Sequence, residues 1–168
     1  MIVMKNRAML IGAIGAGKST LTNALLGREV KAVKTQSLLY YDWIVDTPGE
    51  YSENPLFYKS IMATALEVTH VLYLQDATQR KMIFPPGLST GINKLPIGVI
   101  TKSDSDKADV ELAITLLKRA LVNRGPIVIT SSLKKEGIEE IIALVRMNSL
   151  QEMKTYVENH PSPHIIFS

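Results

Sequence analysis

Short apolar runs alternate with longer amphipathic stretches along most of the chain. The apolar runs predict strands at 8–11, 37–41, 43–45, 68–74, 96–100 and 127–129. The stretches between them predict helices at 19–26, 56–67, 88–94, 106–123 and 137–147. Strands and helices that alternate without an internal repeat are typical of a doubly wound α/β domain. We therefore expect a mostly parallel sheet of about six strands with helices on both faces.

The C-terminal residues extend beyond this alternation. A further helix is predicted at 149–158, and Pro161 and Pro163 are expected to end it. The apolar end, Ile165 to Phe167, is expected to pack on the domain, with docking on a partner as the alternative. We accordingly divide the chain into a domain at 5–147 and a C-terminal extension at 148–168.

The strongest chemical signal lies between the first predicted strand and the first predicted helix. It matches G-x-x-x-x-G-K-[ST], the phosphate-binding P-loop, and predicts nucleotide contacts at Gly12, Ala13, Ile14, Gly15, Ala16, Gly17, Lys18, Ser19 and Thr20. Glycines let the backbone approach phosphate oxygens, and the N–H groups at the start of a helix favour an anion. Lys18 is expected to contact the β- and γ-phosphates, Ser19 to bind Mg²⁺, and Thr20 to bind an inner phosphate. A glycine-rich turn without a ligand is the alternative.

A second candidate motif, Asp46-Thr47-Pro48-Gly49, follows the predicted strand at 43–45. Asp46 is expected to hold Mg²⁺ through water, because Mg²⁺ keeps several of its waters in proteins. The N–H of Gly49 is expected to reach the γ-phosphate, and Thr35, in the preceding loop, is a candidate ligand of Mg²⁺ and the γ-phosphate. Read alone, this tetrapeptide is better explained as a loop of good turn residues, and the phosphate-binding motif upstream favours the nucleotide role. The predicted metal ligands are thus Ser19, Thr35 and Asp46.

Two further stations predict a site for the nucleotide base. In Thr101-Lys102-Ser103-Asp104, the Asp104 carboxylate is expected to accept from the guanine N1–H and N2 amino group, and the Lys102 stem to cover the base. In Ser131-Ser132-Leu133, Ser132 is expected to offer its N–H to guanine O6, and Ser131 to brace Asp104. The alternatives are a helix N-cap at Asp104 and a turn that caps the following helix.

These stations, in this order, resemble those of a small P-loop GTPase of the wider Ras-like family, and D-T-P-G resembles the translation-factor-like class. The segments D-T-P-G-E-Y (46–51), Q-D-A-T (75–78), F-P-P-G (84–87) and G-V-I-T-K-S-D (98–104) together resemble the ethanolamine/propanediol utilization family EutP/PduV. The resemblance runs from about Lys5 to Val145. It implies a P-loop NTPase fold of the Ras-like G-domain type. It also implies a bacterial cytoplasmic protein of amine or diol catabolism, with protein partners in a microcompartment.

Two positions depart from the GTPase pattern. Thr101 stands where the base motif usually has Asn, and its shorter hydroxyl is expected to do less than an amide. We therefore expect GTP and GDP as ligands, with weakened guanine affinity and without exclusion of ATP. Glu50 follows Gly49, where a Ras-like enzyme has its water-positioning Gln. A carboxylate beside a phosphate is a poor base unless its pKa rises, so slow hydrolysis is expected. The candidate catalytic residues are Lys18, Thr35, Gly49 and Glu50.

The composition of the chain bears on which partners it binds and in which cellular compartment it works. The net charge of +3 comes from scattered cations, which disfavours nucleic acid as a partner. Zero cysteines exclude disulfides and thiolate metal sites. No apolar run approaches the length of a membrane span, and the start lacks a signal-peptide pattern, so a cytoplasmic location is expected.

Two functions fit these residues. The first is a nucleotide-switched regulator or chaperone of metabolic enzymes that hydrolyses GTP slowly, and Asp104 and Thr35 favour it. The second is an ATP- or GTP-dependent kinase of short-chain carboxylates of the acetate type, which Thr101 and the absence of Gln at position 50 favour. A nucleotide-free structural module ranks last, because it would leave Lys18 and Ser19 without a role.

Overall fold

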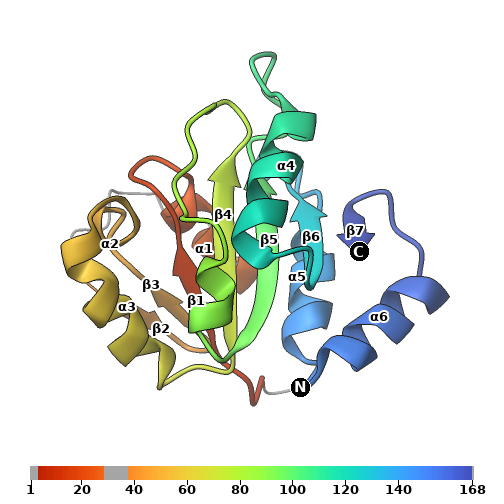
Figure 1. Cartoon of the computed structure of the whole chain (residues 1–168). Coiled ribbons are helices and arrows are strands. Elements are labelled where there is room, and N and C mark those ends of the chain that lie inside the picture. The colour runs from red at the N-terminus through yellow and green to blue at the C-terminus, as the bar shows by residue number, and fades with distance from the viewer. Residues whose placement is uncertain (1–3, 29–37, 168) are drawn as a thin grey trace.

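The computed structural model describes residues 4–28 and 38–167, and its centre is one mixed sheet (Figure 1). The strand order is β2-β3-β1-β4-β5-β6-β7. The strands are β1 Ala8–Ile11, β2 Leu39–Tyr41, β3 Ile44–Asp46, β4 His70–Asp76, β5 Leu95–Thr101, β6 Pro126–Ile129 and β7 Ile165–Phe167. The helices are α1 Lys18–Leu26, α2 Glu50–Glu53, α3 Tyr58–Ala65, α4 Val110–Leu121, α5 Ile138–Val145 and α6 Leu150–Asn159, with short 3₁₀ turns η1 Pro55–Phe57 and η2 Leu88–Gly91.

The five inner strands, β3, β1, β4, β5 and β6, pair in parallel, and both edge strands are antiparallel. The prediction of about six strands is extended by the C-terminal residues. Ile165 to Phe167 form β7, which pairs with β6 in the register Ile127 to Ile166. Ile165 is buried, so this end of the chain packs on the domain itself. The extension predicted at 148–168 is therefore continuous with the sheet.

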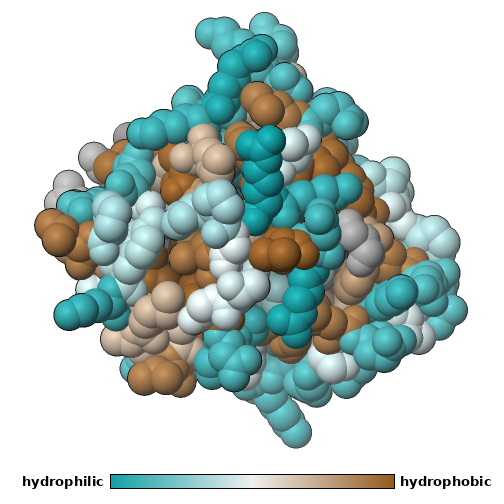
Figure 2. Space-filling view, in the orientation of Figure 1, coloured by the Kyte–Doolittle hydropathy of each residue, from teal (hydrophilic) through white to brown (hydrophobic). Residues whose placement is uncertain are grey.

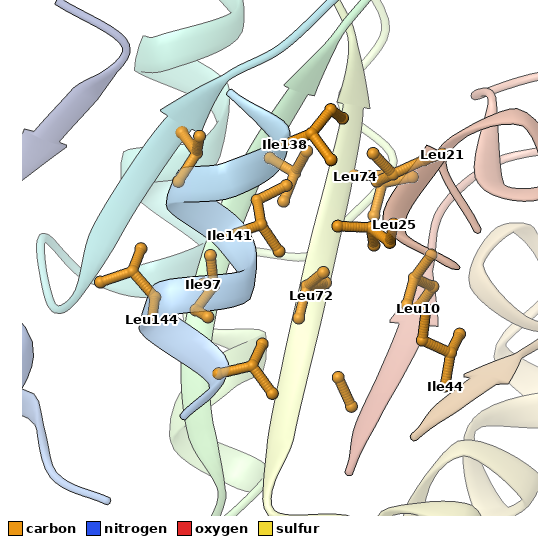
Figure 3. Close-up of a cluster of buried hydrophobic side chains, with 14 of the residues drawn as sticks. Leu10, Leu21, Leu25, Ile44, Leu72, Leu74, Ile97, Ile138, Ile141 and Leu144 are labelled. Atoms are coloured by element: carbon orange, nitrogen blue, oxygen red, sulfur yellow. The ribbon is translucent and has the colours of Figure 1, made fainter. Parts of the chain in front are cut away.

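Side chains from the sheet pack on both of its faces, which explains why the inner strands are apolar without interruption. On β4, Leu72 and Leu74 belong to the cluster beneath α1 and α5, whereas Val71 and Tyr73 belong to the cluster beneath α3 and α4. Figure 3 shows the first cluster, in which side chains of α1 and α5 meet those of the strands. This packing fixes the start of α1, where the phosphate-binding motif lies.

Several element boundaries differ from the sequence-based prediction for local reasons. The helix predicted at 106–123 begins at Val110, because the side chain of Asp109 accepts the Leu112 N–H and caps it. The helix predicted at 56–67 divides into η1 and α3, and the one predicted at 88–94 is the single turn η2. Residues 50–53, for which the sequence predicts neither a strand nor a helix, form the short helix α2.

The surface carries hydrophobic residues in separate places. In the orientation of Figure 2 they form patches between hydrophilic residues. Helices in the described part of the chain are all too short or too polar to cross a membrane.

His70, at the start of β4, gives the fold a dependence on pH. Its side chain is buried beside the Thr69 hydroxyl, with Nδ1 2.8 Å from Oγ1, and burial lowers its pKa to about 4. The unfolded chain, with a histidine pKa near 6.5, binds more protons than the folded protein between pH 4 and 6.5. The contribution of neutral, buried His70 to the free energy of unfolding should therefore be fully present above about pH 6.5. It should decrease as the pH falls towards 4, by up to about 1.4 kcal/mol per pH unit.

Urea unfolding at pH 7, 6 and 5 measures this effect. His70→Gln should flatten the dependence between pH 6.5 and 4, whereas His160→Gln, at the exposed end of α6, should leave it as in the wild type. An equal slope in the wild type and His70→Gln would show that His70 does not cause it.

Candidate nucleotide-binding site

The predicted phosphate-binding loop lies between β1 and α1, at the carboxyl ends of the inner strands (Figure 1). Gly17 has φ of +95°, a conformation that costs glycine little, and the next residue, Lys18, begins α1. The helix thus starts inside the motif, so its first N–H groups are placed as an anion site requires. Ligands are expected at this end of a doubly wound sheet.

Lys18 is buried and turned onto the loop that precedes it. Its Nζ donates to the carbonyl oxygens of Gly12 at 3.0 Å and Ala13 at 3.2 Å. Burial lowers the pKa of Lys18, and the nearby carboxylates of Asp46 and Glu53 partly oppose that shift. A lysine held in this way is a site for a polyanion, since bound phosphate would stabilise its charged form.

Ser19 and Asp46 are brought together as the sequence predicts. Asp46 ends β3, and its Oδ2 accepts from the Ser19 hydroxyl at 3.1 Å. A hydroxyl and a carboxylate are hard oxygen donors, which fits Mg²⁺. The neighbouring Thr47 donates to the carbonyl oxygen of Leu10 at 2.7 Å and so ties the end of β3 to β1. Thr35 lies outside the described residues.

Gly49 lies directly against the phosphate-binding loop. A Cβ on Gly49 would be 2.6 Å from both the Cα and the N of Ile14, so a larger residue cannot fit without a backbone shift. The helix α2 follows at once. Its Glu53 accepts from the Ile14 N–H at 3.4 Å, whereas Glu50, one of the predicted catalytic residues, is exposed. Sequence reasoning missed Glu53, although its spacing of three residues from Glu50 is that of one turn of helix.

Thr101 binds the phosphate loop despite its short side chain. Its hydroxyl donates to the carbonyl oxygen of Ala16 at 2.7 Å. The neighbouring Lys102 donates from Nζ to the carbonyl oxygen of Gly15 at 2.7 Å. The expectation that threonine does less at this position is therefore wrong for the contact with the loop, because the end of β5 lies close enough for a hydroxyl to reach.

Asp104 lies at a cavity beside the same loop. Its Oδ1 accepts from the Ser131 hydroxyl at 2.8 Å, which is the bracing contact that the sequence predicts. The cavity has a volume of about 370 Å³ and is lined by Gly17, Thr20, Thr101, Lys102, Asp104, Ser105, Ser132 and Leu133. Leu133 is 85% exposed at its rim. The structure thus brings the two predicted base stations together, next to the phosphate loop.

The family follows from a comparison with known sequences. The model of the PduV-EutP family, described as ethanolamine utilisation - propanediol utilisation, matches residues 4–147. The chain belongs to the PduV-EutP family. The resemblance inferred from its motifs is thereby confirmed.

Two curated relatives show how similar its members are. The Escherichia coli (strain K12) protein named "Probable acetate kinase EutP" is 39% identical over 113 residues, which cover 66% of this chain and 71% of the relative. The "Propanediol utilization protein PduV" of Citrobacter freundii is 33% identical over 137 residues, which cover 80% of this chain and 89% of the relative. The PduV-EutP chain described here therefore shares most of its length with proteins of both names.

A solved structure of similar fold is that of Aquifex aeolicus Era Y63A bound to GDP.AlF4-. It matches with a TM-score of 0.58 and 22% identity, covering 85% of the PduV-EutP chain and 56% of Era. The fold expected from the sequence, that of a P-loop GTPase, is thereby confirmed.

Proposed function

We propose that this protein binds guanine nucleotides with Mg²⁺, hydrolyses GTP slowly, and acts as a regulator or accessory factor in ethanolamine or propanediol utilisation. The observation that carries the proposal is the cavity at Asp104. It adjoins the phosphate loop, to which Thr101 and Lys102 are hydrogen-bonded. A nucleotide with its phosphates on the loop would have its base beside the Asp104 carboxylate.

The residues at the phosphate end and at the base end of the proposed nucleotide site both support this assignment. Lys18 and the N-terminus of α1 supply the positive charge and N–H groups that a polyphosphate needs. Asp104 supplies an acceptor for the two donors on the Watson–Crick edge of guanine. Adenine has an acceptor at N1 and lacks the N2 amine, so a carboxylate at this position favours guanine.

Ser19 and Asp46 are the described residues that would hold Mg²⁺. When bound, the ion supplies positive charge to the β- and γ-phosphate oxygens. Asp46 accepts from the Ser19 hydroxyl, so the two oxygens are close enough to share one ion. We propose Thr35 as a further ligand in the triphosphate state and the Gly49 N–H as a γ-phosphate donor.

A second candidate is the transfer of a phosphoryl group from ATP or GTP to a short-chain carboxylate such as acetate. The name of the Escherichia coli relative, a probable acetate kinase, favours it. Both functions use the same phosphate loop, so the base specificity and the acceptor separate them. We place either function in the cytoplasm with protein partners of a catabolic microcompartment, as the pathway of the family supports.

Asp104→Asn tests guanine recognition. A carboxylate that accepts two hydrogen bonds from the base contributes about 1.5–3 kcal/mol, so GDP affinity should fall about 10- to 100-fold. Xanthosine diphosphate should bind the variant relatively better, since its ring presents an acceptor where guanine has a donor. Calorimetric titration of GDP, XDP and ADP measures this, with Asp106→Asn in the same loop as the control.

The wild-type titration also separates the two functions. Tighter binding of GDP than of ADP, together with GTP turnover that acetate does not accelerate, supports the regulator. Equal affinity for ADP and GDP would contradict base recognition by Asp104. Formation of acetyl phosphate from acetate and either triphosphate would favour the kinase.

A further inference from the structure

Asp76 is a buried carboxylate to which neither the sequence motifs nor the proposed function gives a role. It is the last residue of β4 and is 6% exposed. Its Oδ1 accepts from the backbone N–H of Thr78 at 2.8 Å and from the Thr78 hydroxyl at 2.6 Å. Its Oδ2 accepts from Nζ of Lys102 at 2.8 Å. Asp76 therefore connects the Q-D-A-T segment to Lys102 in the predicted base-binding motif.

The hydrogen bonds of Asp76 hold its carboxylate in one orientation. A buried carboxylate is costly unless it is paired and hydrogen-bonded, and here Thr78 satisfies one oxygen and thereby directs the other at Lys102. The lysine itself is half-exposed, with 45% of its side chain accessible. Without Asp76, a flexible, strongly hydrated lysine would favour solvent over a fixed position.

The position of Lys102 matters because its ammonium is shared. Nζ contacts the Gly15 carbonyl oxygen as well as Asp76, and Lys102 also lines the cavity at Asp104. The backbone of Lys102 has φ of +60°, a left-handed conformation that is uncommon outside glycine. Thr101 binds the next carbonyl oxygen, that of Ala16, so two consecutive residues of the phosphate loop are held by the last residue of β5 and the residue that follows it.

We propose that Asp76 is a positioning residue for nucleotide binding, which acts by holding Lys102 between the phosphate loop and the base cavity. This inference rests on the proposed function. Asp76 is not among the residues that line the cavity, so it would act through Lys102 and not by contact with the nucleotide. Its carboxylate fixes the ammonium, the ammonium fixes the Gly15 carbonyl, and the loop keeps its N–H groups in place for phosphate.

A double-mutant cycle tests the route through Lys102. Asp76→Asn should weaken GDP binding about tenfold, the loss typical of one hydrogen bond to a charged group. Lys102→Met should weaken it more, because the ammonium at Gly15 is removed entirely. Adding Asp76→Asn to Lys102→Met should cause no further loss, since Asp76 then has no ammonium to hold. Additive losses would overturn the proposal.

Asp109→Asn is the matched control for the loss of a carboxylate. Asp109 lies 3.9 Å from Arg80, whose side chain is well exposed, whereas that of Asp109 is half-exposed, and asparagine caps α4 as well as aspartate does. GDP affinity should match the wild type. A tenfold loss in this variant as well would show that the effect of Asp76→Asn is not specific to the network.

Hydrogen exchange in the nucleotide-free protein separates this inference from the proposed function. Asp76→Asn should speed the exchange of amides in residues 12–17 several-fold relative to the wild type and Asp109→Asn. Unchanged exchange would overturn the role of Asp76 whatever the protein binds, whereas a wild type that fails to bind GDP would contradict the proposed function alone. If Asp76→Asn does not fold, Thr78→Val keeps the charge, and it should give a smaller increase at the same amides. Wild-type exchange in Thr78→Val would then overturn the proposal.

Discussion

Replacing Lys18 with Met should abolish nucleotide binding and leave the protein folded, with a stability equal to or above that of the wild type. The side chain is buried, and its ammonium is compensated in the structure by the carbonyl oxygens of Gly12 and Ala13. Burial lowers the pKa of Lys18, which means that the folded protein holds this charge at a cost. Methionine fills a similar volume without that cost.

The loss of affinity should be large because, in the proposed function, one ammonium contacts two phosphates. Hydrogen bonds to charged groups contribute about 1.5–3 kcal/mol each, so GTP affinity should fall by at least about 100-fold. Titration with GTP and thermal unfolding of the nucleotide-free protein measure the two effects. Lys154→Met, on α6, is the control and should change neither. Wild-type affinity in Lys18→Met would rule out the phosphate loop as the binding site.

Gly49→Ala should separate the triphosphate from the diphosphate state. The added Cβ would lie 2.6 Å from the Cα and N of Ile14, and because both are backbone atoms, either α2 or the phosphate loop must move. Overpacking of this kind costs about 1–3 kcal/mol of stability. The shift would also withdraw the Gly49 N–H from the γ-phosphate, so GTP affinity should fall about tenfold more than GDP affinity.

A second glycine offers a control for Gly49→Ala. A Cβ on Gly91 would meet the flexible end of Met62 at 3.8 Å, which is ordinary van der Waals contact. Gly91→Ala should therefore bind both nucleotides as the wild type does. Equal losses of GTP and GDP affinity in Gly49→Ala would show that Gly49 does not distinguish the γ-phosphate.

The sequence predicts the inner strands well because their burial on both faces demands continuous apolar runs. It does not predict α2 or β7, because each forms through contacts with distant parts of the chain. Residues 50–53 make a single turn of helix with little stability of its own, and it packs against the phosphate loop at Gly49. Ile165 to Phe167 form a strand only because α6 returns the chain to β6. Neither contact leaves a local pattern.

The residues of the candidate site divide in the same way, between those that belong to a local motif and those whose contacts are distant in the sequence. The motifs predict Lys18, Ser19, Asp46 and Asp104 as ligands of phosphate, Mg²⁺ and guanine, because that chemistry calls for those residue types at those spacings. They do not identify Thr47, Glu53 or Asp76, whose partners lie 37, 39 and 26 residues away in the chain.

Thr101 illustrates a further limit of reading residues one at a time. Side-chain length alone predicts a weaker contact than that of Asn, but the distance between two loops decides whether a hydroxyl suffices, and that distance comes from the packed sheet.

The antiparallel strand β7 has a consequence for how the molecule avoids self-association. An uncovered strand at the border of a sheet presents a row of N–H and C=O groups on which another chain can pair and begin to aggregate. β6, rich in Val and Ile, would be such a template, and the pairing of Ile166 with Ile127 occupies it. A shortened chain that ends before Ile165 would expose that row, so the loss of four residues outside the proposed nucleotide site should first reduce the solubility of the protein.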